Sequence, residues 1–497
     1  MKAFTEPLLS LAGFEEMTKT AEKSSGLISV TGCIDAQKSQ MIYAFGGHRK
    51  NKLIVTFGEQ KAKELYDEYS FFDKEVVYYP SKDVLFYQSD IRGNLLTAER
   101  IRALKAIREQ ERVTLVTTFD ALMNTMAPIE KMWENVLTLE QGQLLDLKEI
   151  QAALIRMGYE KEYQVQTMGQ FSVRGGILDV FPLTEENPIR IELWGDEIDT
   201  IRYFDCESQK SIENTDRVSI YPAAELVLSD EEKAGGIEKL KAEAKRVSDK
   251  LRKQMKTEEA HRVTVMADEL TEEWGELSMY AGMDAFLSYF FDERVGLLDY
   301  FKPSDSLIFF DELTRCTEQG KLTETEFSES MKQRLAMGYI LPGQMNGLFT
   351  EKEIVAKLGK YSCIALAALD NKANGLHQLG SYGIHCQSVS PYNNSFELLI
   401  KDLKRYKKNG YRVILLSGSR TRAKRLSEDI TDKGITCFYT ENYDHELFEG
   451  QIMVCYGKVR RGFEYRILKF AVITESDIFG AQQKKKTRHR TYEGEKI

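Results

Sequence analysis

Apolar runs alternate with amphipathic segments along roughly the first quarter of the chain. The pattern predicts strands at 26–32, 52–57 and 75–81, helices at 37–45, 59–69 and 97–110, and a strand that continues into a helix at 112–123. Thr97 stands where a helix cap is favoured, at the start of the third predicted helix. Strands that alternate with helices in this way are typical of a parallel sheet wrapped by helices, which is an α/β fold.

The middle of the chain, from 170 to 212, changes to a period of two with glycine turns, which predicts an antiparallel sheet. In the strand predicted at 188–194, one face carries the core-forming side chains of Ile189, Ile191 and Leu193. The other face carries Arg190, Glu192 and Trp194. Arg and Trp together are typical of a protein-binding hot spot, and Arg174 at a nearby glycine turn could join them. The pattern leaves a second interpretation open, in which a helix of the same domain covers this face and Trp194 belongs to the core.

The rest of the chain is first helix-rich and then returns to alternating strands and helices. Ser229 and Glu232 are spaced as a capping box at the start of a helical region. A second α/β unit is expected from about 355, with a helix at 395–410 and a strand, turn and helix at 411–435. The SGSR turn in this last segment could hold an anion, but such turns more often only connect a strand to a helix, which is the interpretation we favour.

Composition places the chain among ordinary globular proteins. It has 497 residues, of which 42% are hydrophobic and 29% are charged, which suits several domains with real cores. The net charge of −9 gives no general indication of nucleic-acid binding. The seven cysteines are scattered and never spaced as C-x-x-C, which excludes zinc ribbons and favours a reduced, cytoplasmic protein. We expect no signal peptide, no membrane-spanning run and no metal site.

The sequence TGCIDAQKSQ at 31–40 lies between a predicted strand and a predicted helix, and it is close to a phosphate-binding loop. Gly32, Lys38 and Ser39 fit the pattern G-x-x-x-x-G-K-[ST], but Gln37 replaces its second glycine. Such a loop brings backbone N–H groups close to a phosphate, and glycines keep that space free of side chains. The glutamine side chain would occupy the space that the phosphate needs.

An acidic partner for such a loop ends the apolar run SLIFFDEL at 306–313, as Asp311 and Glu312. In ATPases, acids that follow a strand of this kind hold Mg²⁺ and the attacking water. Lys38 and Ser39 could still meet phosphate and Mg²⁺, although an apolar run that ends in an acid is common. We therefore expect a degenerate nucleotide site without hydrolysis, and the pattern leaves residual nucleotide binding open.

Two blocks in the middle of the chain carry a resemblance to a known family. GQFSVRGGILDVFP and DEIDTIRYFDCESQ, within 169–209, resemble the module that the excision-repair protein UvrB shares with the transcription-repair coupling factors (Mfd), where both bind UvrA. The broken loop at 32–39, and VITESDIFG before a basic segment, resemble the coupling factors, whose N-terminal UvrB-like part has lost its ATPase. The segment at 81–96 is too short for the damage-probing hairpin of UvrB. The chain thus resembles the N-terminal, UvrB-like region of a coupling factor.

The resemblance implies a degenerate P-loop (RecA-like) parallel sheet with an inserted, mainly antiparallel α+β domain, followed by a second small α/β domain. The implied units are domain 1A at 1–126, a UvrA-binding domain 2 at 127–222, a helix-rich domain 1B at 223–350 that completes the first sheet, a small α/β domain at 351–480 and a basic linker at 481–497. The UvrA-contacting positions of the family fall on Arg174, Arg190 and Trp194, and relatives usually carry another aromatic residue at the third.

The implied function is recruitment of UvrA to stalled RNA polymerase in transcription-coupled nucleotide excision repair. Contacts with RNA polymerase and DNA, and the ATP-dependent translocase activity, would belong to domains absent from this chain. We therefore expect no catalytic residue, cofactor or metal in it, and we expect a monomer. The resemblance also implies that the C-terminal domain of the intact protein masks the UvrA-binding face. The alternatives are a UvrB-like or helicase-like P-loop ATPase that acts directly on DNA, and UvrB-like recognition of DNA damage.

Overall fold

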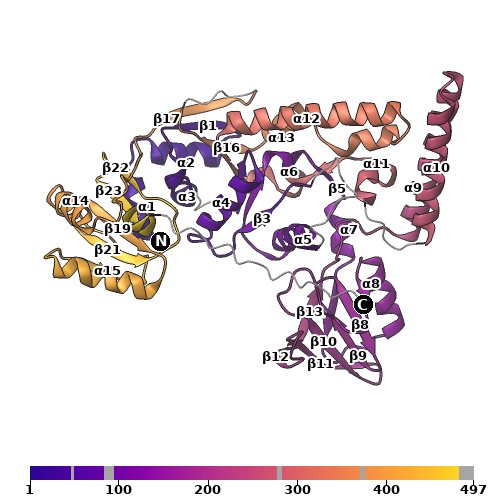
Figure 1. The fold of residues 1–497 in the computed structure, drawn as a ribbon, viewed down its shortest axis with the longest axis horizontal. Coiled ribbons are helices and arrows are strands. Elements are labelled where there is room, and N and C mark those ends of the chain that lie inside the picture. Colours follow the sequence, from indigo (N-terminus) through magenta and orange to yellow (C-terminus); the bar gives the residue numbers. More distant parts are fainter. Residues whose placement is uncertain (46–49, 83–93, 277–281, 370–374, 481–497) are drawn as a thin grey trace, which may run out of the picture.

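The computed structural model describes residues 1–497 apart from 46–49, 83–93, 277–281, 370–374 and 481–497. The expected linker at 481–497 lies outside these described residues, as does most of the segment at 81–96 that bears on the UvrB hairpin. Figure 1 shows a central sheet flanked by helices, with a smaller sheet at one end, long helices at the other, and a further sheet domain below.

A seven-stranded parallel sheet forms the centre of the molecule. Its strands run in the order β17 (Gln378–Gly383), β1 (Gly26–Thr31), β16 (Ser362–Leu366), β15 (Ser306–Asp311), β2 (Asn51–Thr56), β4 (Val113–Thr118) and β3 (Val77–Tyr79). Every neighbouring pair is parallel, as the alternation of strands and helices predicts. Four of these strands precede the middle domain in the sequence and three follow it, so the middle domain is an insertion into this α/β fold.

Two groups of helices cover the two faces of this sheet. One group consists of α5 (Asn94–Glu109), α6 (Phe119–Met123), α12 (Leu313–Ala336) and α13 (Glu351–Leu358). The other group consists of α1 (Lys2–Leu9), α2 (Phe14–Lys23), α3 (Asp35–Ala44) and α4 (Glu59–Tyr69). Because α5 already begins at Asn94, Thr97 lies inside this helix and is not the cap that the sequence predicted.

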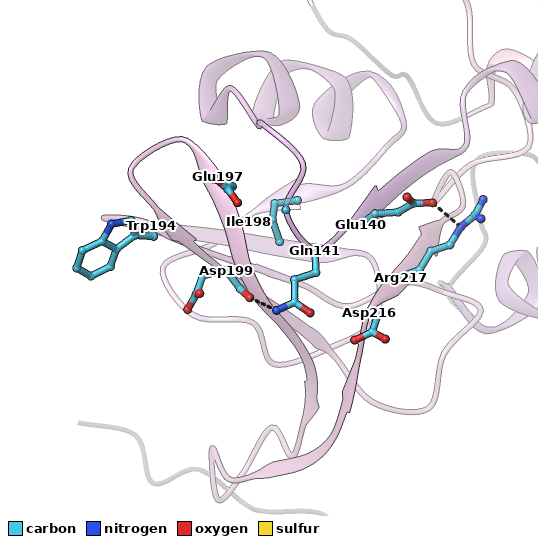
Figure 2. Close-up of a pocket in the computed structure, with 9 residues that line it drawn as sticks. Glu140, Gln141, Trp194, Glu197, Ile198, Asp199, Asp216 and Arg217 are labelled. Carbon is cyan, nitrogen blue, oxygen red and sulfur yellow. Dashed lines mark hydrogen bonds and ion pairs between the residues drawn. The ribbon is translucent and has the colours of Figure 1, made fainter.

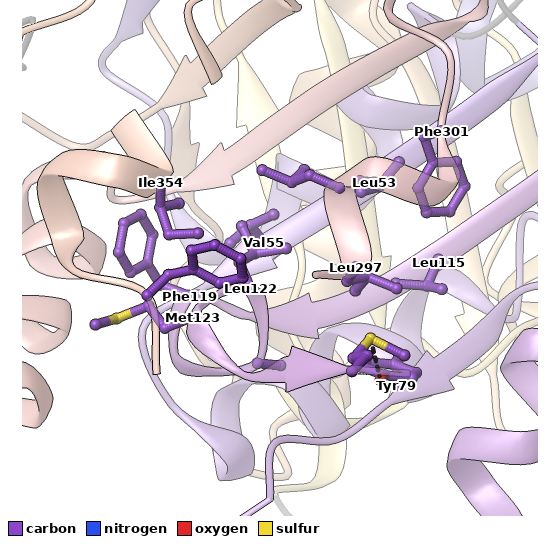
Figure 3. Packing of buried hydrophobic residues seen from close by; sticks show 14 of the residues in the cluster. Leu53, Val55, Tyr79, Leu115, Phe119, Leu122, Met123, Leu297, Phe301 and Ile354 are labelled. Carbon is purple, nitrogen blue, oxygen red and sulfur yellow. Dashed lines mark hydrogen bonds between the residues drawn. The ribbon is translucent and has the colours of Figure 1, made fainter. Parts of the chain in front are cut away.

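Alternate residues of the central strands enter two different cores. Leu53 of β2 and Leu115 of β4 pack with helix residues such as Ile354 in the first core (Figure 3). Their sequence neighbours Ile54 and Val116 enter the second core, on the opposite face. Strands that are buried on both faces read as continuous apolar runs, which is why the hydrophobic pattern located them well.

The middle domain is built on a six-stranded sheet that is antiparallel except where β7 pairs with β8. Its strands run in the order β12 (Ser211–Thr215), β11 (Glu197–Phe204), β10 (Ile189–Trp194), β9 (Ile177–Val180), β8 (Gln170–Arg174) and β7 (Glu160–Lys161). One face packs against α8 (Leu147–Arg156) and the ribbon formed by β6 (Leu137–Glu140) and β13 (Arg217–Ile220). The antiparallel sheet predicted from the period of two is therefore confirmed.

A helical segment leads from the middle domain back to the central sheet. Its elements are α9 (Asp230–Lys253), α10 (Thr257–Glu276), η1 (Met283–Phe286), α11 (Leu287–Phe290), β14 (Val295–Gly296), η2 (Leu297–Tyr300), η3 (Pro303–Asp305) and, after α12, η4 (Pro342–Gly347). β14 pairs with β5 (Thr125–Met126), which is followed by α7 (Ile129–Glu134). Ser229 and Glu232 each accept a hydrogen bond from the other's backbone N–H, which confirms the predicted capping box. None of the helices in the described part of the chain combines the length and the apolar character that a membrane span requires.

A mixed six-stranded sheet forms the last unit. It consists of β18 (Gln387–Ser388), β22 (Phe463–Tyr465), β23 (Phe470–Thr474), β19 (Arg412–Ser417), β21 (Ile452–Tyr456) and β20 (Phe438–Tyr439), in this order, with α14 (Phe396–Lys408), α15 (Arg420–Asp432) and α16 (Glu475–Phe479). Since β16 and β17 belong to the central sheet, the change from one sheet to the next comes after Gly383, later than the boundary expected at 351. An apolar run predicts a buried strand, but it does not say which sheet the strand joins.

The central sheet and the last sheet share one hydrophobic core. Phe4 and Tyr69, from helices that cover the central sheet, belong to the same buried cluster as Ile414, Met453 and Phe470 of the last sheet. The last unit is therefore packed onto the α1–α4 side of the central sheet, and Figure 1 shows it next to α1, α2 and α3.

Candidate partner-binding face and nucleotide site

Two arginines share one buried carboxylate on the face of the middle-domain sheet that lies opposite α8. Asp179 of β9 is paired in register with Arg190 of β10, and it is only 1% exposed. Arg190 donates to its two oxygens from Nε at 2.7 Å and from Nη2 at 2.8 Å, and Arg174 donates from Nη2 at 2.8 Å. A bidentate pair of this kind fixes the orientation of the guanidinium group. The structure thus brings together two of the three predicted partner-binding residues.

Arg190 is held from other sides as well. Its Nη2 also donates to Oε1 of Gln209 at 2.8 Å, and its guanidinium carbon lies 4.3 Å from the centre of the Phe204 ring. Hydrogen bonding to Asp179 is the main cause that raises the pKa of Arg190 above its usual range. The Arg190 side chain is 12% exposed and that of Arg174 is 36% exposed, so Arg174 offers more area to a partner.

Trp194 has the opposite environment from Arg190. Trp194 is the last residue of β10 and precedes Gly195, which has a φ of 64°. The Trp194 residue is 85% exposed. Ile189 and Ile191 are fully buried and pack in the core with α8, as the alternation predicts. The structure therefore decides between the two interpretations of Trp194, because the helix of this domain covers the other face of the sheet. A large exposed aromatic side chain that the fold does not need is a candidate contact for a partner.

An acidic hollow of about 660 Å³ lies beside Trp194 (Figure 2). Its charged lining residues are Glu140, Glu197, Asp199, Asp216 and Arg217. The only cation among them is already paired, since Nε of Arg217 lies 3.3 Å from Oε1 of Glu140. Figure 2 shows the Trp194 ring pointing away from this hollow. These acids could not be grouped from the sequence, because they come from separate strands and turns.

The predicted nucleotide site is filled by its own side chains. Nζ of Lys38 lies 2.5 Å from Oδ1 of Asp311, 2.9 Å from Oε1 of Glu312 and 3.1 Å from Oδ1 of Asp35. The second oxygen of Asp311 accepts a hydrogen bond from the Thr56 hydroxyl at 2.8 Å. Burial alone would lower the pKa of Lys38, but Asp311 and Glu312 outweigh it and raise that pKa. Lys38 is therefore a buried cation, and its charge is neutralised by carboxylates and not by a phosphate.

The backbone N–H groups at the start of the loop are also occupied. The N–H of Gly32 donates to the carbonyl of Ala368 at 3.3 Å, and that of Cys33 donates to Ala367 at 2.9 Å. Gly32 has a φ of 77°, and a Cβ atom there would lie 2.0 Å from the carbonyl oxygen of Ile384. Glycine is thus required at this position by the packing against Ile384 and by the positive φ.

Gln37, which replaces the second glycine of the loop, lies at the contact with the last sheet. Its side chain is fully buried, and Ser39 is 3% exposed. The hydroxyl of Tyr465 lies 3.2 Å from Oε1 of Gln37 and 3.3 Å from Oε1 of Gln40, so it can donate to either. Gln37 stands out in the sequence as the replaced glycine, whereas its partner Tyr465 does not, because it lies 428 residues away along the chain.

A carboxylate occupies the other candidate anion position, at the SGSR turn before α15. Oε2 of Glu475 accepts hydrogen bonds from the N–H of Gly418 at 2.6 Å and from the hydroxyl of Ser417 at 2.8 Å. Oε1 of Glu475 lies 2.7 Å from Nη1 of Arg422. Glu475 therefore stands where an anion would lie at the helix N-terminus, and the turn serves to connect a strand to a helix.

Comparison with known proteins identifies a family that matches the middle domain and relatives that match most of the chain. The UvrB interaction domain family matches residues 137–226, which extend from β6 to just beyond β13. The chain is 28% identical to the transcription-repair-coupling factor of Bacillus subtilis strain 168 over 437 residues, which cover 88% of the chain and 36% of that relative. The corresponding proteins of Staphylococcus haemolyticus strain JCSC1435 and Staphylococcus aureus strain MRSA252 are each 26% identical, over 93% and 96% of the chain and 39% and 40% of the relatives.

The chain spans about two-fifths of the length of these relatives. The match to the UvrB interaction domain falls on the middle domain, where the sequence blocks quoted above lie. The resemblance seen in the sequence is confirmed, because the chain is similar to transcription-repair coupling factors over about nine-tenths of its length and its residues 137–226 match the UvrB interaction domain family.

Proposed function

We propose that this chain recruits UvrA in transcription-coupled nucleotide excision repair, and that the Trp194 end of the middle-domain sheet is the contact. The observation that carries this proposal is the 85% exposure of Trp194 beside arginines that a buried carboxylate holds in place. The family match to residues 137–226 supports it, because that match includes all three predicted contact residues.

The three residues differ in what they offer to UvrA. Trp194 would bury its exposed indole in the interface, and Arg174 would extend a half-exposed charge toward a carboxylate of the partner. Arg190 is largely covered, so its role in this proposal is to position Arg174 and the strand through Asp179. Truncation of a central tryptophan in an interface typically costs ~2 kcal/mol or more, which is about a thirty-fold loss of affinity.

We further propose that this segment neither binds nor hydrolyses ATP. In a working phosphate loop, the lysine and the backbone N–H groups are available to the nucleotide phosphates. Here Lys38 is paired with three carboxylates, and the N–H groups of Gly32 and Cys33 already donate to backbone carbonyls. The pairing argues against the alternative of a P-loop ATPase that acts directly on DNA.

The activity of the whole relatives extends beyond this chain, which spans about two-fifths of their length. We propose that contacts with RNA polymerase, and the ATP-driven movement along DNA that displaces it, belong to the part of the relatives that this chain does not match. On this proposal, the chain supplies the repair-recruiting function, as a monomer in the cytoplasm.

Isothermal titration calorimetry of the chain against purified UvrA tests the recruiting function. We expect binding by the wild-type chain and at least about a thirty-fold loss of affinity for Trp194→Ala. Ile467→Ala is a matched control, because Ile467 is 72% exposed but lies in the turn between β22 and β23 of the last sheet. Failure of the folded wild-type chain to bind UvrA would overturn the proposal, and equal losses in both variants would overturn the assignment to Trp194.

A further inference from the structure

The end of α9 and the turn after it carry a concentrated positive charge in a chain whose net charge is −9. Between residues 239 and 256 there are only two acids, Glu243 and Asp249. The same stretch contains the eight basic residues Lys239, Lys241, Lys245, Arg246, Lys250, Arg252, Lys253 and Lys256. The excess of six positive charges over eighteen residues stands out against the acidic rest of the chain.

Most of these cations are free of partners. Six of them are exposed and, within the described part of the chain, make no ion pair, namely Lys241, Lys245, Lys250, Arg252, Lys253 and Lys256. Glu243 cannot neutralise them well, because its carboxylate turns inward and accepts hydrogen bonds from the Tyr289 hydroxyl and the Gly343 N–H. The charge therefore faces water.

The packing of the α9–α10 hairpin determines where this charge points. Leu240, Ala244, Ser248 and Leu251 of α9 are buried along one side of the helix. Ser248 donates to the carbonyl of Ala260 at 3.1 Å, which places α10 on that side. The lysines and arginines lie on the remaining surface of α9, together with the exposed acids Glu238 and Asp249, and Figure 1 shows the two helices at the edge of the molecule.

The helix dipole explains only part of this arrangement. Cations are favoured in the last turn of a helix, and Lys250, Arg252 and Lys253 are in the last turn of α9. The dipole effect falls off within that turn, whereas Lys241 and Lys245 lie two to three turns earlier. Lys241, Lys245 and Arg252 share one side of α9 at intervals of about 6 Å and 10 Å along its axis.

We propose that the basic surface of α9, formed by Lys241, Lys245, Lys250, Arg252 and Lys253, binds the sugar–phosphate backbone of duplex DNA without reading its sequence. The positive charge of this surface favours a polyanion as its ligand. The small number of exposed apolar side chains on it favours nucleic acid over a protein. A protein partner would need an apolar centre in the interface, and within 239–256 Met255 is the sole large exposed apolar side chain. Phosphate contacts need only flexible cations that lie in water, which is what α9 presents.

Contacts of this kind have a characteristic strength and salt dependence. Non-specific binding at physiological salt has a Kd of about 10⁻⁴–10⁻⁶ M, and log K falls with log salt by about 0.9 for each phosphate neutralised. Contact through four side chains of α9 therefore predicts a slope of about −3.6. This inference does not depend on the proposal for UvrA, which concerns another domain.

Fluorescence anisotropy with a labelled duplex DNA, over a range of KCl concentrations, tests the proposal with the full chain. The α9 variant is K245Q/K250Q/R252Q/K253Q, and the control is K401Q/K404Q/K407Q/K408Q in α14, which removes four exposed cations elsewhere. We expect the α9 variant to lose at least about ten-fold in affinity at low salt and the magnitude of its salt slope to fall by about 3, with little change in the control.

Three results would overturn the proposal. The first is the absence of DNA binding by the wild-type chain at low salt. The second is an equal loss in the α9 and α14 variants when circular dichroism shows that both are folded, because the effect would then reflect net charge alone. The third is tighter binding of a poly-glutamate peptide than of DNA, lost in the α9 variant, because the surface would then suit an acidic protein segment.

Discussion

The Nζ atom of Lys38 lies 2.5 Å from Oδ1 of Asp311, and both side chains are 1% exposed. In the nucleotide site that the sequence predicts, Lys38 would meet phosphate and Asp311 would hold Mg²⁺. Here they neutralise each other directly, with Glu312 and Asp35 also close to the lysine. The pair of Lys38 and Asp311 is part of the core, so we expect it to matter for stability.

We expect Lys38→Met to destabilise the chain by ~3–5 kcal/mol, because the substitution leaves the buried carboxylate of Asp311 without its cation. Urea unfolding measures the change. Lys61→Met is the control, since Lys61 pairs with Asp35, a carboxylate that is 69% exposed, and an exposed pair contributes about 1 kcal/mol at most. Equal effects of the two substitutions would contradict the idea that the Lys38 pairing supports the fold.

We expect Mg²⁺ and ATP to leave the melting temperature unchanged, because the groups that would bind phosphate are already occupied. A ligand present at 100 times its Kd would add about 2.7 kcal/mol of stability, which a thermal melt detects easily. A rise in melting temperature that Lys38→Met abolishes would show that the loop still binds nucleotide.

We expect Asp179→Ala and Trp194→Ala to separate stability from binding. Asp179→Ala leaves the largely covered Arg190 without its carboxylate and should cost ~3 kcal/mol of unfolding free energy, and UvrA binding should weaken with it. Trp194→Ala should change the unfolding free energy by only about 0.5 kcal/mol or less, because its side chain is exposed, yet weaken UvrA binding about thirty-fold. Urea unfolding and calorimetry of both variants give the two values. A large loss of stability in Trp194→Ala would contradict this division of roles.

Glu68 should make the stability of the chain depend on pH. Burial raises the pKa of Glu68 to about 7, although Arg460 from the last sheet lies 4.0 Å away and works against the shift. The folded state therefore holds this proton more tightly than the unfolded state, and stability falls as the pH rises from about 4.5 to about 7. Glu68→Gln should stabilise the chain by about 3 kcal/mol at pH 8 and leave it unchanged below the unfolded pKa.

Urea unfolding of wild type and Glu68→Gln at low and high pH measures this difference. Glu64→Gln serves as a control of opposite sign, because Glu64 pairs with Arg460 at 2.8 Å and its pKa is lowered. That variant should be less stable than wild type at pH 8. The expectation for Glu68 fails if Glu68→Gln is destabilising at high pH.

The sequence could predict those parts of the fold that depend on local periodicity. Strands β1, β2, β3, β4 and β15 of the central sheet and the alternation of Ile189 and Ile191 were predictable, because burial leaves a regular pattern of apolar residues. The assignment of β16 and β17 to the central sheet was not, since strand pairing across a sheet joins residues that are distant in the sequence. The boundary expected at 351 was displaced for this reason.

In the candidate sites as well, some residues could be predicted from the local sequence, whereas their partners from distant segments could not. Arg174, Arg190 and Trp194 could be singled out from one strand and one turn. Asp179, the partner that the two arginines share, could be seen only after the strands were paired. Asp179 does leave a signal, as an acid inside the otherwise apolar strand β9. Tyr465, which contacts Gln37, has no comparable signal, because a buried tyrosine in a strand is common in any core.

Leu137 at the start of the middle domain is paired with Ile220 at its end, through the ribbon of β6 and β13. Both ends of the domain are therefore held a few ångströms apart by the domain itself. A domain whose two ends lie close together can be inserted into a loop of another fold, since the loop ends of that fold need not move far apart. Recruitment of a repair partner could in this way be carried by one insertion and combined with different hosts, independently of what the host sheet does.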